Sequence, residues 1–457
     1  MAVFEKKSLL ACSAEDLFDW HAREGAFERL IPPWRTVQVV SRKGGIETGA
    51  EIVTRLKQFG VYQKWIARIE DCELGRGFRD TQIEGPFALW THRHAFEERG
   101  SDACRLVDSI DYELPAGAMG RVLGGGYVKG ELERVFEYRH AITKNDLSIC
   151  NRYRDQPRLR VLISGGYGFI GSRLVAFLRA QGNEVRVLSR NPRAGDVAWN
   201  PASGEIDSTA LEGFDVVIHL AGKNLADGRW NEQVKRDLWK SRVDGGHLLV
   251  GALKNVRNPP SVFVCMSGVG FYGERGDAST KESDERGEGF LAELCEAWEG
   301  VASAAEAFAE RTLVLRTGVV VDGGDGALSK MRLPFSLGLG GRLGSGRQWM
   351  PWIALEDWLT ATHQLVRDGR SGAYNLVAPV PCRNRDFTKA LGTALRRPTV
   401  LPVPAGLLSL ALGEFGREAL LSSCRAYPKR LLDEGYEFRY SEIREALLFS
   451  MGKRSAL

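Results

Sequence analysis

The chain has 457 residues, of which 44% are hydrophobic and 26% are charged. This length suits two or three globular domains with sizeable cores. The 62 basic and 58 acidic residues give a formal net charge of +4, and this near-balance argues against a nucleic-acid or an anionic-membrane partner. Eight scattered cysteines form no Cys-x-x-Cys pair, which favours reduced thiols.

Two segments bear on membranes and targeting. The N-terminus carries charge at Glu5, Lys6 and Lys7 and has no apolar core of signal-peptide length. The longest apolar run, 400–412, contains two prolines and is too short to cross a bilayer. We therefore expect the run to form a buried helix, and the chain to be cytoplasmic and without membrane insertion.

Residues 1–145 show the two-residue alternation of strands with one buried face. The clearest runs are 51–56, 62–69 and 105–114. Helices are predicted near the start, with Ser13 as N-cap and Asp16 three positions later, and at 129–139. Strands between an early and a late helix predict an α+β domain with a curved antiparallel sheet.

The polar segment 146–158 is the predicted linker. From residue 159 to 385 strands alternate with helices, which predicts an α/β doubly wound parallel sheet of Rossmann type. Residues 386–457 predict a smaller helical lobe. The expected strands are 159–163, 184–188, 216–221, 262–267 and 312–321, and the expected helices are 230–250, 289–311, 386–395, 406–421 and 441–448.

A glycine-rich turn at 164–171, Ser-Gly-Gly-Tyr-Gly-Phe-Ile-Gly, directly follows the first of these strands. In this spacing Gly165 permits the tight turn, Gly168 the close approach of a pyrophosphate, and Gly171 the packing of helix on strand. Phe169 and Ile170 open the following helix, whose N-terminus favours negative charge. The strand before the turn and the helical apolar spacing after it predict a dinucleotide site.

The second strand ends at Ser189 and Arg190, where an NAD-selective site usually has an acidic residue. A guanidinium beside a hydroxyl suits a 2′-phosphate, so NADP is favoured over NAD. A third set of cofactor contacts is expected from the small residues that end the 216–221 strand, namely Leu220, Ala221 and Gly222. The preceding His219 is interpreted as a packed core histidine.

The segments 164–171, 219–222 and 264–273 together resemble the extended short-chain dehydrogenase/reductase superfamily. Within it the chain resembles the epimerase-family branch, which is similar to sugar-nucleotide epimerases. Residues 420–440 resemble the C-terminal domain of unknown function of that branch. Further marks of the branch are 290–292, 298–299, 316–320, 340–352 and 372–376.

The N-terminal region resembles the START-like, polyketide-cyclase-like helix-grip fold. The resemblance rests on 32–34, Asp80, 85–87, Trp90, His92, 94–96, Asp108 and 112–115. It implies a bent sheet around a long helix over an apolar cavity, and hence a hydrophobic ligand. His92 and His94 share one strand face, but no third ligand is visible, so we expect an exposed strand face and no metal site.

The sequence departs from the superfamily at its catalytic helix. The resemblance implies a Tyr-x-x-x-Lys pair whose tyrosine transfers a proton, whereas the corresponding helix begins at Phe290 and reads Phe-Leu-Ala-Glu-Leu-Cys. The resemblance gives Ser267 a substrate-orienting hydroxyl. Tyr272 is the alternative proton donor, although the matching family tyrosine mainly packs. Glu293 or Glu296 is a further alternative.

The loop 338–349 is too rich in glycine for a regular element. Two interpretations stay open, a mobile lid that presents Arg342, Arg347 and Trp349 to an anionic substrate such as a sugar nucleotide, and a flexible surface connection.

These features lead to three hypotheses. In the first, the chain is an NADP-binding oxidoreductase or epimerase-like enzyme that transfers hydride to or from a small-molecule substrate near Ser267. In the second, it is a catalytically silent NADP-binding regulatory protein coupled to the START-like domain. In the third, the N-terminal domain carries a lipid or quinone that the second domain reduces. Phe290 favours the second hypothesis, whereas Ser267 and the arginine-bearing loop favour the first.

Overall fold

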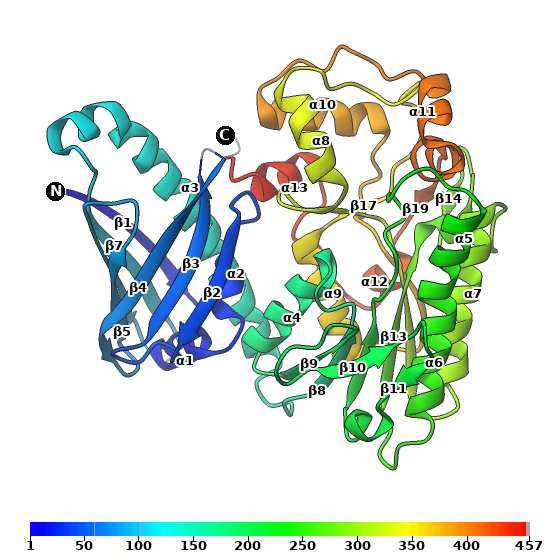
Figure 1. Cartoon of the computed structure of the whole chain (residues 1–457), viewed down its shortest axis with the longest axis horizontal. Coiled ribbons are helices and arrows are strands. Elements are labelled where there is room, and N and C mark those ends of the chain that lie inside the picture. The colour runs from blue at the N-terminus through cyan, green and yellow to red at the C-terminus, as the bar shows by residue number, and fades with distance from the viewer. Residues whose placement is uncertain (59, 101, 454–457) are drawn as a thin grey trace. The chain divides into compact units, whose positions relative to one another are not determined.

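The computed structural model describes residues 1–58, 60–100 and 102–453. Their contacts divide the chain into two compact units. The first comprises Met1–Pro157 with Ala176–Gly182 and Phe449–Leu457, and the second comprises Arg158–Val175 and Asn183–Leu448. Each unit is described by itself (Figure 1).

The first unit contains an antiparallel sheet of seven strands in the order β1-β7-β6-β5-β4-β3-β2. Figure 1 shows the long helix α3, in cyan, running along this sheet. The elements of the first unit are β1 (Ala2–Leu10), α1 (Ala14–Ala22), α2 (Ala26–Arg29), β2 (Val37–Lys43), β3 (Glu51–Gln58), β4 (Val61–Glu73), β5 (Gly77–Glu84), β6 (Leu89–Glu98), β7 (Cys104–Glu113) and α3 (Gly117–Arg152). The predicted α+β helix-grip arrangement is confirmed.

The alternation of the sequence explains which face of this sheet is buried. On β6, Trp90, His92, His94 and Phe96 are all buried, as the two-residue period requires. The N-cap prediction at Ser13 is also confirmed, because its hydroxyl accepts from the Asp16 amide in a capping box. The segment expected as a linker from residue 146 is instead helical through the end of α3.

The second unit holds an eight-stranded sheet in the order β11-β10-β9-β8-β12-β13-β15-β18, parallel except at β11. Its strands are β8 (Arg160–Ser164), β9 (Glu184–Ser189), β10 (Val197–Asn200), β11 (Glu205–Ile206), β12 (Val216–His219), β13 (Val262–Gly268), β15 (Arg311–Thr317) and β18 (Gly372–Leu376). Two small parallel pairs join β14 (Ser279–Thr280) to β19 (Arg425–Ala426), and β16 (Val319–Val321) to β17 (Trp352–Ala354).

The helices of this region are α4 (Phe169–Ala180), α5 (Glu232–Trp239), α6 (Gly245–Leu253), α7 (Phe290–Ala305), α8 (Gly326–Ser336), α9 (Leu355–Asp368), α10 (Asn384–Leu395), α11 (Ala405–Leu412), α12 (Lys429–Asp433) and α13 (Ile443–Ser450). Short turns of other helical types are η1 (Ser208–Leu211), η2 (Lys240–Asp244), η3 (Val269–Tyr272) and η4 (Gly416–Leu421). The predicted doubly wound sheet with a C-terminal helical lobe is confirmed. Three predicted elements are divided, since η2 separates α5 from α6, Gly318 separates β15 from β16, and residues 413–415 separate α11 from η4.

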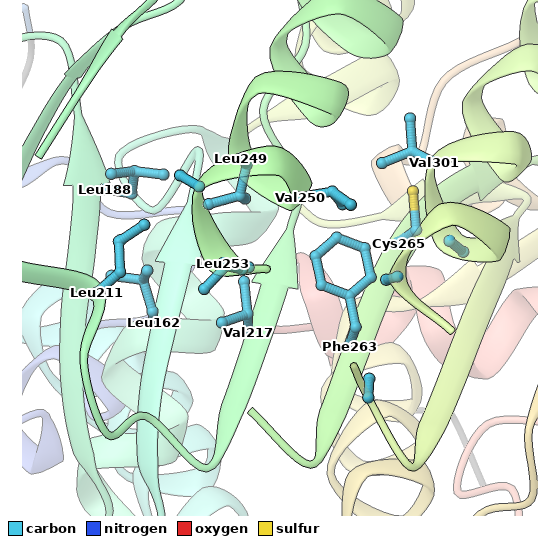
Figure 2. Packing of buried hydrophobic residues seen from close by; sticks show 14 of the residues in the cluster. Leu162, Leu188, Leu211, Val217, Leu249, Val250, Leu253, Phe263, Cys265 and Val301 are labelled. Atoms are coloured by element: carbon cyan, nitrogen blue, oxygen red, sulfur yellow. The ribbon is translucent and has the colours of Figure 1, made fainter. Parts of the chain in front are cut away.

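The strand order reverses between β8 and β12, so their carboxyl ends flank a topological switch point, the usual ligand crevice of such sheets. Figure 1 shows α5, α6 and α7 together on one side of the sheet. Figure 2 shows how α6 packs there, with Leu249 and Leu253 turned toward Leu162 and Val217 of the strands below. This core fixes the strand ends that carry the candidate site.

The apolar run 400–412 does not form a buried helix. Only α11 is helical within it, and Leu408 is its buried residue. Leu407 and Leu410 are 56% and 71% exposed, so the prediction of burial was wrong. Among the residues that the structure describes, no helix combines the length and the apolar character needed to cross a membrane.

Candidate functional site

The glycine-rich turn links β8 to α4 at the switch point. Gly165 has a φ of +74°, and a Cβ there would lie 2.9 Å from the Ala221 nitrogen. A Cβ on Gly171 would lie 2.1 Å from the Gly165 carbonyl oxygen. A Cβ on Gly168 would meet only that same oxygen, at 3.3 Å, and Gly168 is exposed. Gly165 and Gly171 therefore allow close packing, whereas Gly168 leaves the backbone accessible.

Phe169 and Ile170 begin α4, and both are partly exposed. The first N–H groups of a helix have no acceptor within it, so they are available to an anion. Leu220 and Ala221 cross close to Gly165, and the Leu220 amide donates to the Ser164 carbonyl over 3.1 Å. The structure thus brings together the turn and the small residues after β12, as a dinucleotide site requires.

Ser164 and His219 connect the carboxyl ends of β8 and β12. The Ser164 hydroxyl lies 2.7 Å from Nδ1 of His219 and accepts from the Ala221 amide over 3.3 Å. His219 is fully buried, and burial lowers its pKa to about 4. The interpretation of His219 as a packed core histidine is confirmed.

The loop after β9 contains the candidate 2′-phosphate contacts. Ser189 is half-buried, and its hydroxyl accepts from the Asn191 amide over 3.1 Å. Arg190 is exposed, and in the described part of the chain no carboxylate pairs with it. Sequence reasoning missed Arg193, whose guanidinium lies over the Tyr167 ring at 3.9 Å.

A buried charge network lies at the end of β13. Ser267 is 2% exposed and donates to Glu299 of α7 over 2.8 Å. Arg316 of β15 binds the same carboxylate through Nε and Nη2, at 2.9 and 2.8 Å. Ser267 therefore faces α7 rather than an open edge of the sheet. In the sequence, Glu299 and Arg316 are only marks of the family resemblance, and their spacing does not reveal that they form an ion pair.

Tyr272 belongs to the same network. Its hydroxyl donates to Asn375 Oδ1 over 2.7 Å and accepts from Arg316 Nη1 over 3.0 Å. Its side chain is fully buried, and burial raises its pKa to about 12. This environment favours the packing interpretation of Tyr272 over that of a proton donor at neutral pH.

The N-terminus of α7 is where the superfamily tyrosine would stand. The Phe290 and Leu291 amides donate to the Glu418 carboxylate over 3.2 and 2.9 Å. Nζ of Lys235 lies 5.1 Å from the centre of the Phe290 ring. A lysine thus lies beside the aromatic ring, but the ring has no hydroxyl.

Glu293 and Glu296 lie on the exposed face of α7, and Glu296 pairs with Arg286 at 2.9 Å. Neither is brought into the buried network around Ser267.

Many contacts hold the 338–349 loop in place. Its Gly344 amide donates to the Val403 carbonyl over 2.8 Å, and the Trp349 indole donates to Asp277 over 2.7 Å. Arg383 and Arg425 lie 4.3 and 4.9 Å from the Trp349 ring. Arg342 and Arg347 are exposed. These bonds support neither a mobile lid nor a loose connection, and Trp349 is already engaged by protein groups.

His92 and His94, expected on an exposed strand face, are buried beneath α3, with 3% and 9% exposure. That expectation was wrong. A carboxylate that could serve as a third ligand is also present, because Asp80 on β5 lies directly opposite His92. Sequence spacing did not reveal it, since Asp80 and His92 meet only through the pairing of β5 with β6.

Three family models match the chain. They are polyketide cyclase / dehydrase and lipid transport over residues 10–134, the NAD dependent epimerase/dehydratase family over 161–376, and a domain of unknown function, DUF1731, over 403–448. Together they cover both units.

Individual proteins agree with these models. An epimerase family protein of Mycobacterium leprae is 41% identical over 298 residues, which cover 65% of this chain and 96% of the relative. The solved nucleoside-diphosphate sugar epimerase from Corynebacterium glutamicum is 29% identical with a TM-score of 0.81, over 98% of this chain and 90% of that one. The human epimerase family protein SDR39U1, solved with NADPH, is 34% identical with a TM-score of 0.59, over 64% of this chain and 99% of that one.

Proposed function

This chain belongs to the epimerase family, and we propose that it binds NADP(H) and transfers hydride between this cofactor and a carbonyl or hydroxyl carbon of a small-molecule substrate. The observation that carries the proposal is the turn at 165–171, where glycine is required by contacts and the first turn of α4 stays accessible. The NADPH in the solved human relative supports the same cofactor for this chain. When bound, the nicotinamide supplies or accepts the hydride.

The residues of the turn bind and orient the pyrophosphate. Phe169 and Ile170 offer N–H groups at the positive end of α4, and Gly168 leaves room for the phosphate oxygens. Leu220, Ala221 and Gly222 follow the neighbouring strand and let the cofactor lie close to the sheet edge.

The choice of NADP over NAD rests on charge at the end of β9. Arg190 is exposed and has no carboxylate partner within the described ranges, so its guanidinium is available to a 2′-phosphate beside the Ser189 hydroxyl. Arg193 adds a second positive charge in the same loop, held over Tyr167. NAD-selective sites have an acidic side chain that holds the ribose 2′-OH, and this chain has Arg190 at that position instead.

A charge reversal tests this assignment. We expect Arg190→Glu to weaken NADPH binding by the full-length chain at least tenfold and NADH binding less than threefold. Arg257→Glu is the matched control. It makes the same charge change just before β13, at the amino ends of the parallel strands and so away from the cofactor crevice at their carboxyl ends. Tighter binding of NADH than of NADPH by the unmodified chain would contradict the NADP assignment.

A second function is favoured by the burial of the two catalytic candidates. Ser267 donates to Glu299 and Tyr272 donates to Asn375, and both side chains are nearly inaccessible. Phe290, at the position that the resemblance gives to the tyrosine, has no hydroxyl to transfer a proton. These observations support a protein that binds NADP(H) without turnover and regulates a partner or the N-terminal unit.

The absorbance of NADPH separates the two functions. The full-length chain is mixed with NADPH and with quinones, aldehydes or oxidised sugar nucleotides, one compound at a time. Oxidation of NADPH that is lost in Gly168→Ala supports the enzyme. Tight NADPH binding with no oxidation across the panel supports the regulatory protein.

For the N-terminal unit we propose a hydrophobic ligand. The matched family model includes lipid transport, and Trp90 and Tyr112 of the sheet pack in one apolar cluster with Phe136 of α3. Enrichment of a lipid or quinone with the purified chain, identified by mass spectrometry, tests this part of the proposal.

A further inference from the structure

Polar side chains interrupt the apolar face of the N-terminal sheet. Asp80 of β5 lies opposite His92 of β6, and His94 of β6 lies opposite Asp108 of β7. These four inward positions separate an apolar cluster around Phe18 and Phe78 from another around Trp90 and Phe136. A buried polar group costs free energy unless it has a partner, so this cluster calls for a specific explanation.

Three of these side chains converge on one point. The Asp80 carboxylate lies 3.3 Å from Nδ1 of His92 and 3.7 Å from Nε2 of His94. One ligand atom from each residue lies within 4.8 Å of the other two. Ligand atoms about 2.0–2.2 Å from a tetrahedral zinc ion are about 3.4 Å apart. Small side-chain movements would therefore bring the ligand atoms of Asp80, His92 and His94 to the separations that zinc requires.

The opposite nitrogens of the two rings face one shared carboxylate, that of Asp108. Asp108 Oδ1 is hydrogen-bonded to Nε2 of His92 over 2.9 Å, and it lies 2.7 Å from Nδ1 of His94 without forming a hydrogen bond to it. Asp108 Oδ2 lies 2.7 Å from Nε2 of His140 on α3, whose Nδ1 lies 2.8 Å from the Ser8 hydroxyl. Metal-bound histidines commonly donate their second N–H to a carboxylate, as Nε2 of His92 can to Asp108, and this fixes the ring orientation and the tautomer.

From this arrangement we propose that Asp80, His92 and His94 bind one divalent transition-metal ion inside the N-terminal unit, with Asp108 as the positioning residue for both rings. Two imidazoles and one carboxylate leave at least one coordination position for water or a ligand, as in catalytic rather than structural sites. Asp80 is the most exposed of the three, at 16%, and gives the site its contact with solvent.

Charge favours an ion over a hydrogen-bonded cluster. Asp80 and Asp108 bring two negative charges into a buried region. A divalent ion balances both and leaves the two ligating imidazoles neutral, as ligation requires. The Asp80 carboxylate lies 3.3 and 3.7 Å from the two ligating nitrogens and supplies one of these negative charges where the ion would lie.

The donor set narrows the choice of metal. Imidazole nitrogens suit zinc, iron, nickel and copper, whereas Mg²⁺ and Ca²⁺ prefer oxygen ligands alone. Two histidines and one carboxylate with open positions are typical of Zn²⁺ and Fe²⁺ sites. Zn²⁺ is the probe of choice because it needs no control of redox state.

Metal binding by the tag-free, full-length chain tests the proposal. After removal of metal with a chelator, the chain is titrated with Zn²⁺ in competition with a chromophoric chelator. We expect one equivalent to bind. Asp80→Asn and His94→Gln should weaken binding more than a hundredfold, and Asp108→Asn by 10–100-fold, as loss of an outer partner does.

The matched control is Asp111→Asn, because Asp111 lies on the outward face of β7, one residue from the inward Ile110, and should bind Zn²⁺ as the unmodified chain does. Circular dichroism and melting of each variant show whether it is folded. Unchanged Zn²⁺ binding in Asp80→Asn, or less than a tenth of an equivalent bound by the unmodified chain, overturns the proposal.

Cobalt gives a readout that does not depend on any variant. Co²⁺ bound by nitrogen and oxygen ligands gives weak visible bands without the intense near-ultraviolet band of thiolate ligation. A thiolate band would place the metal at one of the cysteines and would contradict the assignment to Asp80, His92 and His94.

Discussion

Ser164 and His219 are joined by a contact of 2.7 Å between hydroxyl and Nδ1, directly before the glycine-rich turn. The Ser164 oxygen also accepts from the Ala221 amide, and Nε2 of His219 lies 3.4 Å from the Arg242 carbonyl. Because burial keeps the imidazole neutral and Nε2 faces a carbonyl, Nε2 donates and Nδ1 accepts from the Ser164 hydroxyl. A proton on Nδ1 would remove the acceptor of the Ser164 hydroxyl and break this connection between β8 and β12.

The first prediction concerns pH. Burial lowers the pKa of His219 to about 4, below its ordinary value of 6.5. His219 therefore contributes stability that is fully present above pH 6.5 and is lost as pH falls through about 4. Protonation of this group should lower the free energy of unfolding by about 3 kcal/mol between pH 7 and pH 4. Urea unfolding at several pH values measures it.

His219→Gln is the comparison variant, because it removes the titrating ring and retains every other histidine. The free energy of unfolding of this variant should fall less steeply with decreasing pH than that of the unmodified chain. Parallel pH profiles for the two proteins would show that His219 is not the responsible group.

The second prediction separates two glycines of the turn. In Gly171→Ala the new Cβ would lie 2.1 Å from the Gly165 carbonyl oxygen, so α4 must shift against β8. We expect the free energy of unfolding to fall by about 2 kcal/mol or more. In Gly168→Ala the nearest atom is at 3.3 Å, so thermal stability should change little while NADPH affinity falls at least tenfold. Equal loss of stability in both variants would contradict these separate roles.

The glycine turn was predictable from the sequence because its requirements are local. A strand, three spaced glycines and a helix follow one another within about 20 residues, and the parallel strand order follows from their alternation with helices. The pairing of Asp80 with His92 was not predictable, since it depends on the register of β5 against β6. The exposure of Leu407 and Leu410 was missed for a related reason, because an apolar run does not reveal whether another element covers it.

The third prediction concerns the ion pair between Glu299 and Arg316, which lies mostly out of solvent, with side-chain exposures of 14% and 7%. Removing one partner leaves the other charge buried without compensation. We expect Glu299→Gln to lower the free energy of unfolding by about 3 kcal/mol. Arg316→Met should cost a similar amount.

Chemical denaturation of the single and double variants measures the coupling of this pair. The double variant should cost clearly less than the sum of the single ones, because the two side chains share the interaction. Additive losses would show that Arg316 is held by Tyr272 and the Glu282 carbonyl and that its pairing with Glu299 adds little.

The fourth prediction decides the role of Tyr272. Burial raises its pKa to about 12, so the phenol stays protonated at neutral pH and its hydroxyl serves Asn375 and Arg316. Tyr272→Phe leaves two buried polar groups without this partner, and we expect it to lower the free energy of unfolding by about 1–3 kcal/mol. NADPH affinity and any rate of NADPH oxidation should stay within twofold.

Tyr374→Phe is the matched control for Tyr272→Phe. Tyr374 is another fully buried tyrosine, and its hydroxyl bonds to the Arg370 carbonyl and to Glu434. Both variants should therefore lose stability without losing a catalytic group. A hundredfold fall in the rate of NADPH oxidation in Tyr272→Phe alone, with binding and folding retained, would instead make Tyr272 the proton donor. That result would require the hydroxyl to leave Asn375 and reach the substrate when the cofactor binds.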